Sequence, residues 1–222
     1  MDNCVKEVIK KRLEKTAEAL RRNNMEAYVT ENSAEAVEKI RELLHKGDSI
    51  SCGGTVTLEE CGVKELMRSG DYDFIDRSKA QTPEEAEEVY RRTFCCDTFL
   101  TSANAVTECG EIYNVDGNSN RVAAIAYGPK NVIFVVGYNK IVPTIADAVT
   151  RVKKVCAPAN GVRLGTGTPC EKTGECISCK TGGDVAKGCL SERRMCCNYL
   201  VSAYQRHKNR FKVILVAEEL GY

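Results

Sequence analysis

Five consecutive apolar residues, Val132 to Val136, constrain the fold of this chain more than any other stretch. The run lacks the alternation of apolar and polar residues that a half-exposed strand shows, so it is typical of a strand buried on both faces of a sheet. It is also far too short to cross a lipid bilayer, which takes about 20 residues. The sequence therefore predicts an internal strand in a sheet that is covered on both sides.

Helix-like and strand-like segments alternate along the rest of the chain. Helical apolar stripes mark residues 3–24 and a segment that we expect Ser33 to cap, and a capping box with proline at the first helical position begins a helix at Thr82-Pro83-Glu84-Glu85. Further helices are expected from Val56, over 119–126 and over 143–154, and further strands at 27–29, 49–52, 72–75, 98–100, 111–115 and 213–217. This alternation predicts an α/β domain with a mainly parallel sheet and helices on both faces.

Length and composition indicate one ordinary globular domain over residues 1–222. The 222 residues are 43% hydrophobic and 28% charged, and the net charge of +1 gives no argument for a nucleic acid or an anionic membrane as partner. The first residues form a charged amphipathic segment that lacks the apolar core of a signal peptide. We therefore expect a cytoplasmic protein without a membrane span.

The segment 101–121, TSANAVTECGEIYNVDGNSNR, concentrates polar and small side chains between two predicted strands. Its glycines permit sharp turns, and its acids, amides and guanidinium offer acceptors, donors and a bidentate anion clamp. The candidate site residues of this segment are Asn104, Thr107, Glu108, Asn114, Asp116, Gly117, Asn120 and Arg121. Two interpretations remain open: the wall of a ligand site, or a hairpin whose turns need Gly, Asn and Asp.

A second candidate loop, Gly53-Gly54-Thr55, lies between a predicted strand and a predicted helix. Unpaired backbone N–H groups and the helix dipole can bind an anion at such a place. The loop lacks both the Walker lysine pattern and the full dinucleotide fingerprint, so a plain turn is the alternative. Ligands of parallel sheets bind beyond the carboxyl ends of strands, and this position would let the loop share one crevice with Asn104–Glu108.

These residues also carry a family resemblance. Asn104–Gly110, Asn114–Ala124, Gly128–Lys130 and Gly137 with Asn139 and Lys140 resemble motifs of the LUD-domain (lactate utilisation) family, namely N-A-(V/I)-T-E-x-G, N-x-D-G-x-x-N-R-V-A-A, G-P-K and G-x-N-K. Gly53–Glu60 resembles the G-G-(S/T)-x-T-L-E-E stretch of that family. The resemblance implies the fold shared by glucosamine-phosphate isomerases, ribose-phosphate isomerases and CoA-transferases.

The resemblance implies a role in lactate or related hydroxy-acid utilisation, as one component of an L-lactate oxidising system. It implies a small anionic metabolite as ligand, other lactate-utilisation subunits as partners, and a homo-oligomer as a further option. Glu108 would be the catalytic acid/base, Arg121 would grip a carboxylate, and Asn104, Asn114, Asp116 and Asn120 would orient the substrate. Fold-level analogy leaves open a non-redox enzyme acting on a phosphosugar, folate or CoA-type ligand, and a non-catalytic assembly subunit. The sequence has no flavin or nicotinamide fingerprint.

Thirteen cysteines are unusually many, and seven of them lie in a cysteine-rich segment at about 156–198. A Cys-x2-Cys step lets two thiolates reach one ion, so zinc, an iron–sulfur cluster, and free or redox-active thiols are the three alternatives. The segment resembles a LUD subset with T-P-C-x5-C-x2-C and a later C-N, which implies Cys170, Cys176, Cys179 and Cys197 as metal ligands, with Cys189 and Cys196 as substitutes. The repeated cysteine run of ferredoxin-like extensions is missing, which argues against electron transfer.

Overall fold

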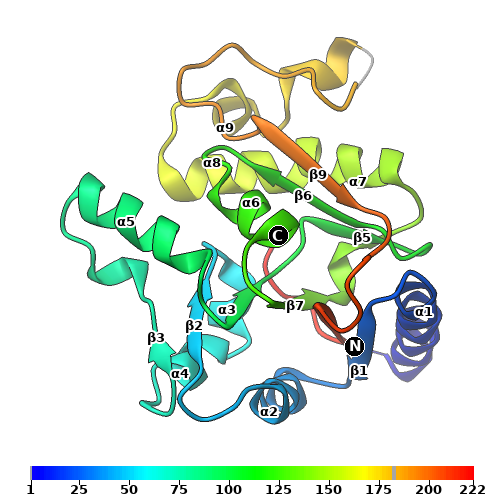
Figure 1. Cartoon of the computed structure of the whole chain (residues 1–222). Helices are drawn as coiled ribbons and strands as arrows, with labels where there is room; N and C mark the ends of the chain where they lie inside the picture. The colour runs from blue at the N-terminus through cyan, green and yellow to red at the C-terminus, as the bar shows by residue number, and fades with distance from the viewer. Residues whose placement is uncertain (1, 182–183) are drawn as a thin grey trace.

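Six parallel strands form the central sheet of the computed structural model, which describes residues 2–181 and 184–222 (Figure 1). Their order across the sheet is β1 (Glu26–Thr30), β10 (Phe211–Val216), β7 (Asn131–Gly137), β4 (Thr98–Thr101), β2 (Ser49–Cys52) and β3 (Asp73–Phe74). The predicted internal strand is β7, which lies between β10 and β4 and is buried from Val132 onward. The mainly parallel sheet is therefore confirmed.

The side chains of β7 alternate between two hydrophobic cores, one on each face of the sheet. Val132, Phe134 and Val136 pack with α1 (Asn3–Arg22) and α6 (Asn120–Tyr127). Ile133 and Val135 pack with α2 (Ser33–Leu43), α3 (Val56–Glu60) and α4 (Val63–Met67). Helices cover both faces, which explains why this strand has no polar residue between Val132 and Val136.

A second, four-stranded sheet was not predicted. Its order is β8 (Ile141–Val142), β5 (Ala105–Thr107), β6 (Ile112–Asp116) and β9 (Asn198–Ser202). The pairs β5–β6 and β6–β9 are antiparallel, whereas β5–β8 is parallel. Sequence reasoning found β6 alone because β5 and β8 are very short and β9 begins only where the cysteine-rich segment ends. Tyr113 and Val115 of this sheet pack against Val149 and Val152.

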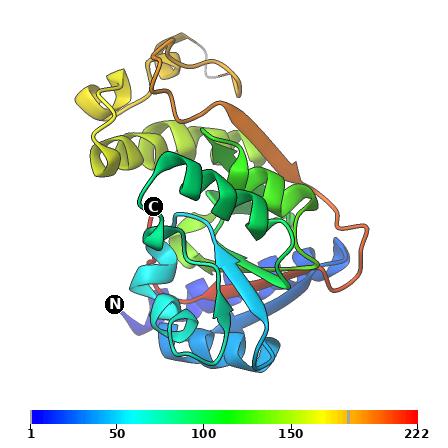
Figure 2. The same cartoon turned by 60° about the vertical axis from the view of Figure 1, so that its left-hand side comes forward.

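The helix predicted over 143–154 is longer than expected. It runs from α7 (Ile145–Arg151) through a π-helical turn, η3 (Val152–Cys156), into α8 (Ala157–Leu164). The wide π turn lies next to Pro158, whose ring and missing N–H disturb a regular helix, and Gly165 ends the helix with φ of 57°. The short α9 (Pro169–Thr173) and η4 (Ile177–Thr181) follow in the cysteine-rich segment, which forms the top of the view in Figure 2.

The two predicted helix starts each differ from the prediction in one residue: the cap of α2, and the backbone donor to the Glu85 carboxylate at α5. Asn32, not Ser33, caps α2: its Oδ1 accepts from the Glu35 N–H at 3.0 Å. Thr82 does cap α5 (Pro83–Thr93), accepting from the Glu85 N–H at 3.2 Å. The Glu85 carboxylate accepts from the backbone N–H of Gln81 at 2.7 Å, one residue before the cap.

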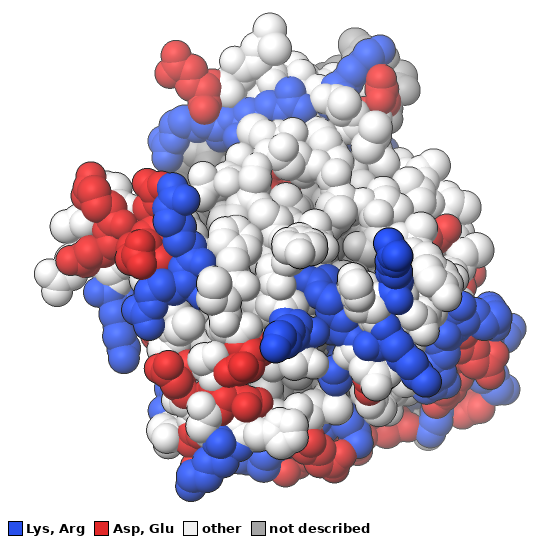
Figure 3. All heavy atoms as spheres, viewed as in Figure 1, with Lys and Arg blue, Asp and Glu red and all other residues white. Residues whose placement is uncertain are grey.

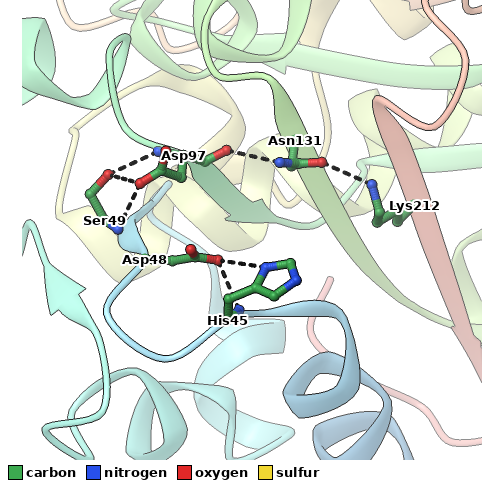
Figure 4. Close-up of polar contacts among 6 residues, drawn as sticks. All are labelled: His45, Asp48, Ser49, Asp97, Asn131 and Lys212. Atoms are coloured by element: carbon green, nitrogen blue, oxygen red, sulfur yellow. Dashed lines mark hydrogen bonds and ion pairs between the residues drawn. The ribbon is translucent and has the colours of Figure 1, made fainter.

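Polar side chains tie the amino ends of the central strands together (Figure 4). Asp97 accepts from the backbone N–H and the hydroxyl of Ser49 at 2.9 and 2.5 Å, and these bonds lower the pKa of Asp97. Asn131 donates to the Asp97 carbonyl at 3.3 Å and accepts from Lys212 at 2.9 Å. The cavity that most of the predicted site residues line lies at the opposite, carboxyl ends. The described residues contain no helix that combines the length and the apolar composition of a membrane span.

Candidate functional site

Loops at the carboxyl ends of β2, β4 and β7 form the floor of a cavity of about 530 Å³. The floor residues are Gly54–Thr57 after β2, Ser102–Asn104 after β4 and Lys140 after β7. Residues 115–118, 120 and 121 form one wall, and parts of η3 and α8 with residues 193–196 form another. The cavity therefore lies where ligands of parallel sheets bind.

Most of the predicted site residues come together here, although they come from distant parts of the sequence. Those that line the cavity are Gly54, Thr55, Asn104, Asp116, Gly117, Asn120 and Arg121. Gly53 and Asn114 lie directly behind the lining and contact Arg121. The glycine loop and part of the polar segment thus share one hollow, whereas Thr107 and Glu108 lie elsewhere.

Arg121 is a structural bridge in this site. Its Nη1 donates to Asn114 Oδ1 at 2.6 Å, and its Nη2 donates to Asn104 Oδ1 at 2.9 Å and to the Val115 carbonyl at 2.6 Å. These bonds join the loop after β4 to β6 and α6. The Nη1 and Nη2 donors of Arg121 were expected to bind a substrate carboxylate, but they already bond within the protein. Arg121 nevertheless lines the cavity and contributes its positive charge to it.

Asp116 holds the start of α6. Its Oδ2 accepts from the backbone N–H groups of Arg121 at 2.8 Å and of Val122 at 3.2 Å, and its Oδ1 accepts from the Asn118 N–H at 3.2 Å. A carboxylate at this position satisfies donors that a helix start leaves unpaired. Asp116 lines the cavity, but its oxygens are engaged in shaping the wall.

Glu108 lies on the β5–β6 hairpin, against α1 and outside the cavity. Its carboxylate pairs with Arg12 Nε at 2.7 Å, and the glutamate side chain is 45% exposed. Thr107 and Glu111 bond to each other in the same turn, and Gly110 approaches the backbone of α1 so closely that a Cβ atom would lie 2.7 Å from the Ala19 carbonyl carbon. Here the hairpin interpretation describes the structure, and we assign Glu108 and Thr107 no role in the cavity.

Three exposed arginines that the sequence analysis did not select line the cavity from separate elements. Arg77 lies in η1 (Arg77–Lys79), Arg163 in α8, and Arg193 in the segment before β9. Arg77 donates to the Tyr90 hydroxyl at 2.9 Å and Arg163 to Asn160 Oδ1 at 2.7 Å. In Figure 3, basic side chains border a mostly uncharged surface between the cysteine-rich segment at the top and α5 on the left. In sequence, these arginines are indistinguishable from ordinary exposed charges.

The balance of charge around the cavity is strongly positive. The basic lining residues are Arg77, Arg121, Lys140, Arg163, Arg193 and Arg194, and the only acidic residue in the described lining is Asp116. Within residues 2–181 and 184–222, none of Arg77, Arg163 and Arg193 forms an ion pair with a carboxylate. Unpaired guanidinium groups around one hollow favour an anionic ligand.

Lys140 is a buried cavity residue to which the sequence analysis gave no role. It is the last residue of η2 (Tyr138–Lys140), and it lines the cavity floor although it is only 2% exposed. Its Nζ donates to Thr57 Oγ1 at 2.6 Å and to Ser102 Oγ at 3.1 Å. Burial, reinforced by the nearby charge of Arg151, lowers the pKa of Lys140 to about 7.

Four cysteines of the cysteine-rich segment, called the tail below, line a small separate cavity of about 20 Å³. They are Cys170, Cys176, Cys189 and Cys196. Cys179 and Cys197, which the family resemblance implied as ligands, do not line it, and Cys197 is exposed. The two substitutes, Cys189 and Cys196, take their places. Over the described parts of the chain, no three Cys, His, Asp or Glu side chains are arranged to hold a metal ion. The ligand set that the family resemblance implied stays a prediction, as does metal binding itself, and we derive no step through a metal.

Arg194 connects this cysteine cluster to the larger cavity. Its guanidinium donates to the carbonyls of Cys196 at 2.9 Å, Ala186 at 2.8 Å and Cys189 at 3.3 Å, so it organises the tail around itself. Arg194, Met195 and Cys196 line both cavities. The tail thus forms part of the wall of the main site. Residues 182 and 183 of the predicted cysteine-rich segment lie outside the described residues.

Comparisons with known proteins agree with this architecture. A crystal structure of a DUF162 family protein from Deinococcus radiodurans is similar, with a TM-score of 0.51 and 17% sequence identity over 94% of this chain and 98% of that chain, a likeness that supports the fold alone. The search of curated proteins gave no match. The LUD domain family model matches residues 13–216, which include the central sheet and every residue of the polar segment. The chain therefore belongs to the LUD-domain family.

Proposed function

We propose that this protein binds a small anionic metabolite in the cavity at the carboxyl ends of β2, β4 and β7. The observation that carries the proposal is the set of three exposed arginines, Arg77, Arg163 and Arg193, that surround the cavity and have no carboxylate partner in the part of the chain that the structure describes. A guanidinium group binds carboxylate or phosphate oxygens in a bidentate manner, which gives both affinity and orientation. The amides of Asn104 and Asn120 line the same space and supply neutral hydrogen-bonding groups for the rest of the ligand.

Within that proposal, we assign the protein to lactate or related hydroxy-acid utilisation, as a component of an L-lactate oxidising system. Membership of the LUD-domain family and the basic cavity support this assignment. A hydroxy acid offers a carboxylate to an arginine and a hydroxyl to an amide. Its oxidation needs an electron acceptor, and we expect a partner subunit to supply it because the sequence has no flavin or nicotinamide fingerprint.

The size of the cavity favours a second candidate function. A volume of about 530 Å³ is within the range of about 300–1,000 Å³ that ligand sites commonly have, and it exceeds what a three-carbon acid fills. Several arginines around a larger space suit a phosphorylated ligand. The alternative is therefore a non-redox enzyme that acts on a phosphosugar or on a CoA- or folate-type ligand.

A thermal-shift panel tests both candidates. The unfolding temperature is measured with lactate, with sugar phosphates and with CoA esters, because a ligand that binds only the native state raises stability by about 2.7 kcal/mol at one hundred times its Kd. Stabilisation by hydroxy acids alone supports the first assignment, and stabilisation by phosphorylated compounds alone supports the second. No shift with any anion would contradict the binding proposal itself.

Matched variants locate the binding site. The triple variant Arg77→Ala, Arg163→Ala, Arg193→Ala should lose the ligand-induced shift. Arg22→Ala removes an arginine that is also exposed, at the end of α1 and outside the cavity lining, and this variant should keep the shift. Equal shifts in the triple variant and in Arg22→Ala would place the anion elsewhere on the protein.

A further inference from the structure

We propose that the amine of Lys140 forms a covalent imine with the carbonyl group of a small anionic carbonyl compound bound in the cavity. The inference rests on the proposed anion site and adds a reactive group and a substrate class to it. It starts from the position of Lys140, whose side chain is almost completely buried and nevertheless lines the cavity floor.

The surroundings of the Lys140 amine do not match those of a structural ammonium group. The partners of its Nζ are two neutral hydroxyls, Thr57 Oγ1 at 2.6 Å and Ser102 Oγ at 3.1 Å, and no carboxylate within the described residues pairs with it. A buried charge without a counter-ion is strongly unfavourable, so the site favours the neutral amine. A neutral amine has a free electron pair and is a nucleophile.

Two neighbouring cations act in the same direction as burial, whereas Cys156 and Glu60 oppose them. Arg121 and Arg151 lie close enough to repel a proton from Lys140, and both are held in place by hydrogen bonds to the protein. Burial and these two cations lower the pKa of Lys140 to about 7. A large share of the amine is then uncharged near neutral pH, against roughly one in a thousand or fewer for an exposed lysine. Desolvation together with neighbouring cations is a known way to activate a lysine for attack on a carbonyl.

The reaction needs only groups at hand. The Lys140 nitrogen attacks the carbonyl carbon, a C–N bond forms, and the carbonyl oxygen takes up the proton that the nitrogen loses. The resulting hydroxyl receives the second proton of the nitrogen and leaves as water while the nitrogen electron pair forms the C=N bond, so the neutral imine forms without an oxidant or reductant. The hydroxyls of Thr57 and Ser102 already bond to Nζ and can carry the proton from nitrogen to oxygen. The cavity arginines hold the anionic group of the substrate.

Another buried lysine provides a matched control. Lys153 is 5% exposed and donates to Ser178 Oγ and to the Lys187 carbonyl, both at 2.8 Å. Its side chain does not line the main cavity. Lys153 therefore shares the burial of Lys140 but not its access to ligand.

The experiment traps the imine by reduction. The full chain is incubated with pyruvate or with dihydroxyacetone phosphate, which carry a carboxylate and a phosphate respectively, and sodium borohydride is added before peptide mass spectrometry. Lactate, which has a hydroxyl in place of the carbonyl of pyruvate, is the ligand control. We expect a reduced adduct on the Lys140 peptide with at least one carbonyl compound, at least about tenfold above any other lysine including Lys153, and none with lactate. Which of the two compounds reacts identifies the anionic group.

Variants and pH give independent readouts. Lys140→Met should remove the adduct, Lys153→Met should retain it, and trapping on Lys140 should fall as the pH is lowered from 8 to 5. The proposal would be overturned if adducts were spread evenly over exposed lysines and were equal in the wild type and Lys140→Met. If Lys140→Met fails to fold, the adduct map of the wild type alone decides the question. Thermal stabilisation by pyruvate without any Lys140 adduct would overturn the imine while leaving the anion site intact, whereas the loss of both would remove the anion site as well.

Discussion

Gly53 and Arg121 are in direct contact: a Cβ atom on Gly53 would lie 2.9 Å from Cδ of Arg121. The arginine is not free to move away, because its guanidinium is fixed by Asn104, Asn114 and the Val115 carbonyl. The glycine loop after β2 and the polar segment after β4 are therefore packed against each other through these two residues. This contact brings two segments that are far apart in sequence to one cavity.

Gly53→Ala should destabilise the protein. The added methyl group overlaps a fixed side chain, and we expect a loss of about 1–3 kcal/mol in the free energy of unfolding, measured by urea denaturation. Gly54→Ala is the control, because a Cβ there meets only the flexible end of Arg77 at 3.5 Å and should change stability by less than about 0.5 kcal/mol. Equal stability of the two variants would show that the arginine yields to the methyl group.

Arg121→Lys should be destabilising although it keeps the charge. A lysine ammonium cannot match the planar fork that reaches acceptors on β6 and on the loop after β4, so buried oxygens such as Asn114 Oδ1 lose their donor. We expect a loss of about 1–3 kcal/mol in the free energy of unfolding. Arg22→Lys, on the exposed end of α1, serves as the reference and should have the same free energy of unfolding as the wild type.

Glu108→Ala should leave ligand-induced stabilisation unchanged, because Glu108 lies outside the cavity lining. Its ion pair with Arg12 joins two side chains that are 45% and 40% exposed, and such pairs contribute about 0–1 kcal/mol to stability. The measurement is the thermal shift with the best ligand of the panel, in wild type and variant. Loss of the shift in a folded Glu108→Ala protein would restore the role that the family resemblance implied.

Lys140 should make stability depend on pH in a defined window. Its folded-state pKa of about 7 is below the ordinary value of 10.5, so the unfolded chain binds more protons between these values. Stability therefore rises with pH through the window from about 7 to 10.5, and the unfavourable contribution of Lys140 is fully present below pH 7. Urea denaturation of the wild type and Lys140→Met at several pH values should show the wild type gaining on the variant as pH rises.

Lys140→Arg provides the complementary comparison for this window. The guanidinium stays charged throughout, so this variant should be less stable than the wild type and should fall further behind as pH rises. A difference that stays constant from pH 7 to pH 10 would argue against the lowered pKa of Lys140.

The thiols should divide into two reactivity classes. Cys4, Cys95, Cys109 and Cys197 are exposed and should be alkylated quickly in the native protein, whereas Cys170, Cys176 and Cys189 are buried and should react only on unfolding. Burial also raises the pKa of the Cys170 thiol, which leaves less of the reactive thiolate. Iodoacetamide labelling followed by peptide mass spectrometry measures the order, and rapid native labelling of Cys170 would contradict it.

Metal analysis of protein purified without oxygen tests the remaining prediction for the tail. If zinc, or iron with sulfide, is present in stoichiometric amount, its ligands can be assigned by serine variants. Loss of the metal in Cys189→Ser and Cys196→Ser but not in Cys179→Ser would assign the site to the small cavity. Loss in Cys179→Ser and Cys197→Ser would support the set that the family resemblance implied.

The sequence by itself determined the features that depend on local pattern. The apolar run of β7 predicted a strand buried on both faces, and the alternation of segments predicted the parallel sheet, because both follow from side-chain spacing along the backbone. The motifs also selected Gly54, Asn104, Asp116 and Arg121, which all line the cavity.

Only the tertiary structure decided what each of these residues does. It placed Glu108 against α1 and committed the guanidinium of Arg121 to the cavity wall, since both depend on neighbours that are distant in sequence. It also brought Arg77, Arg163 and Lys140 around one hollow. Charge and reactivity at a site depend on burial and on the partners that packing supplies. The spacing of residues along the chain determines neither the burial nor the partners.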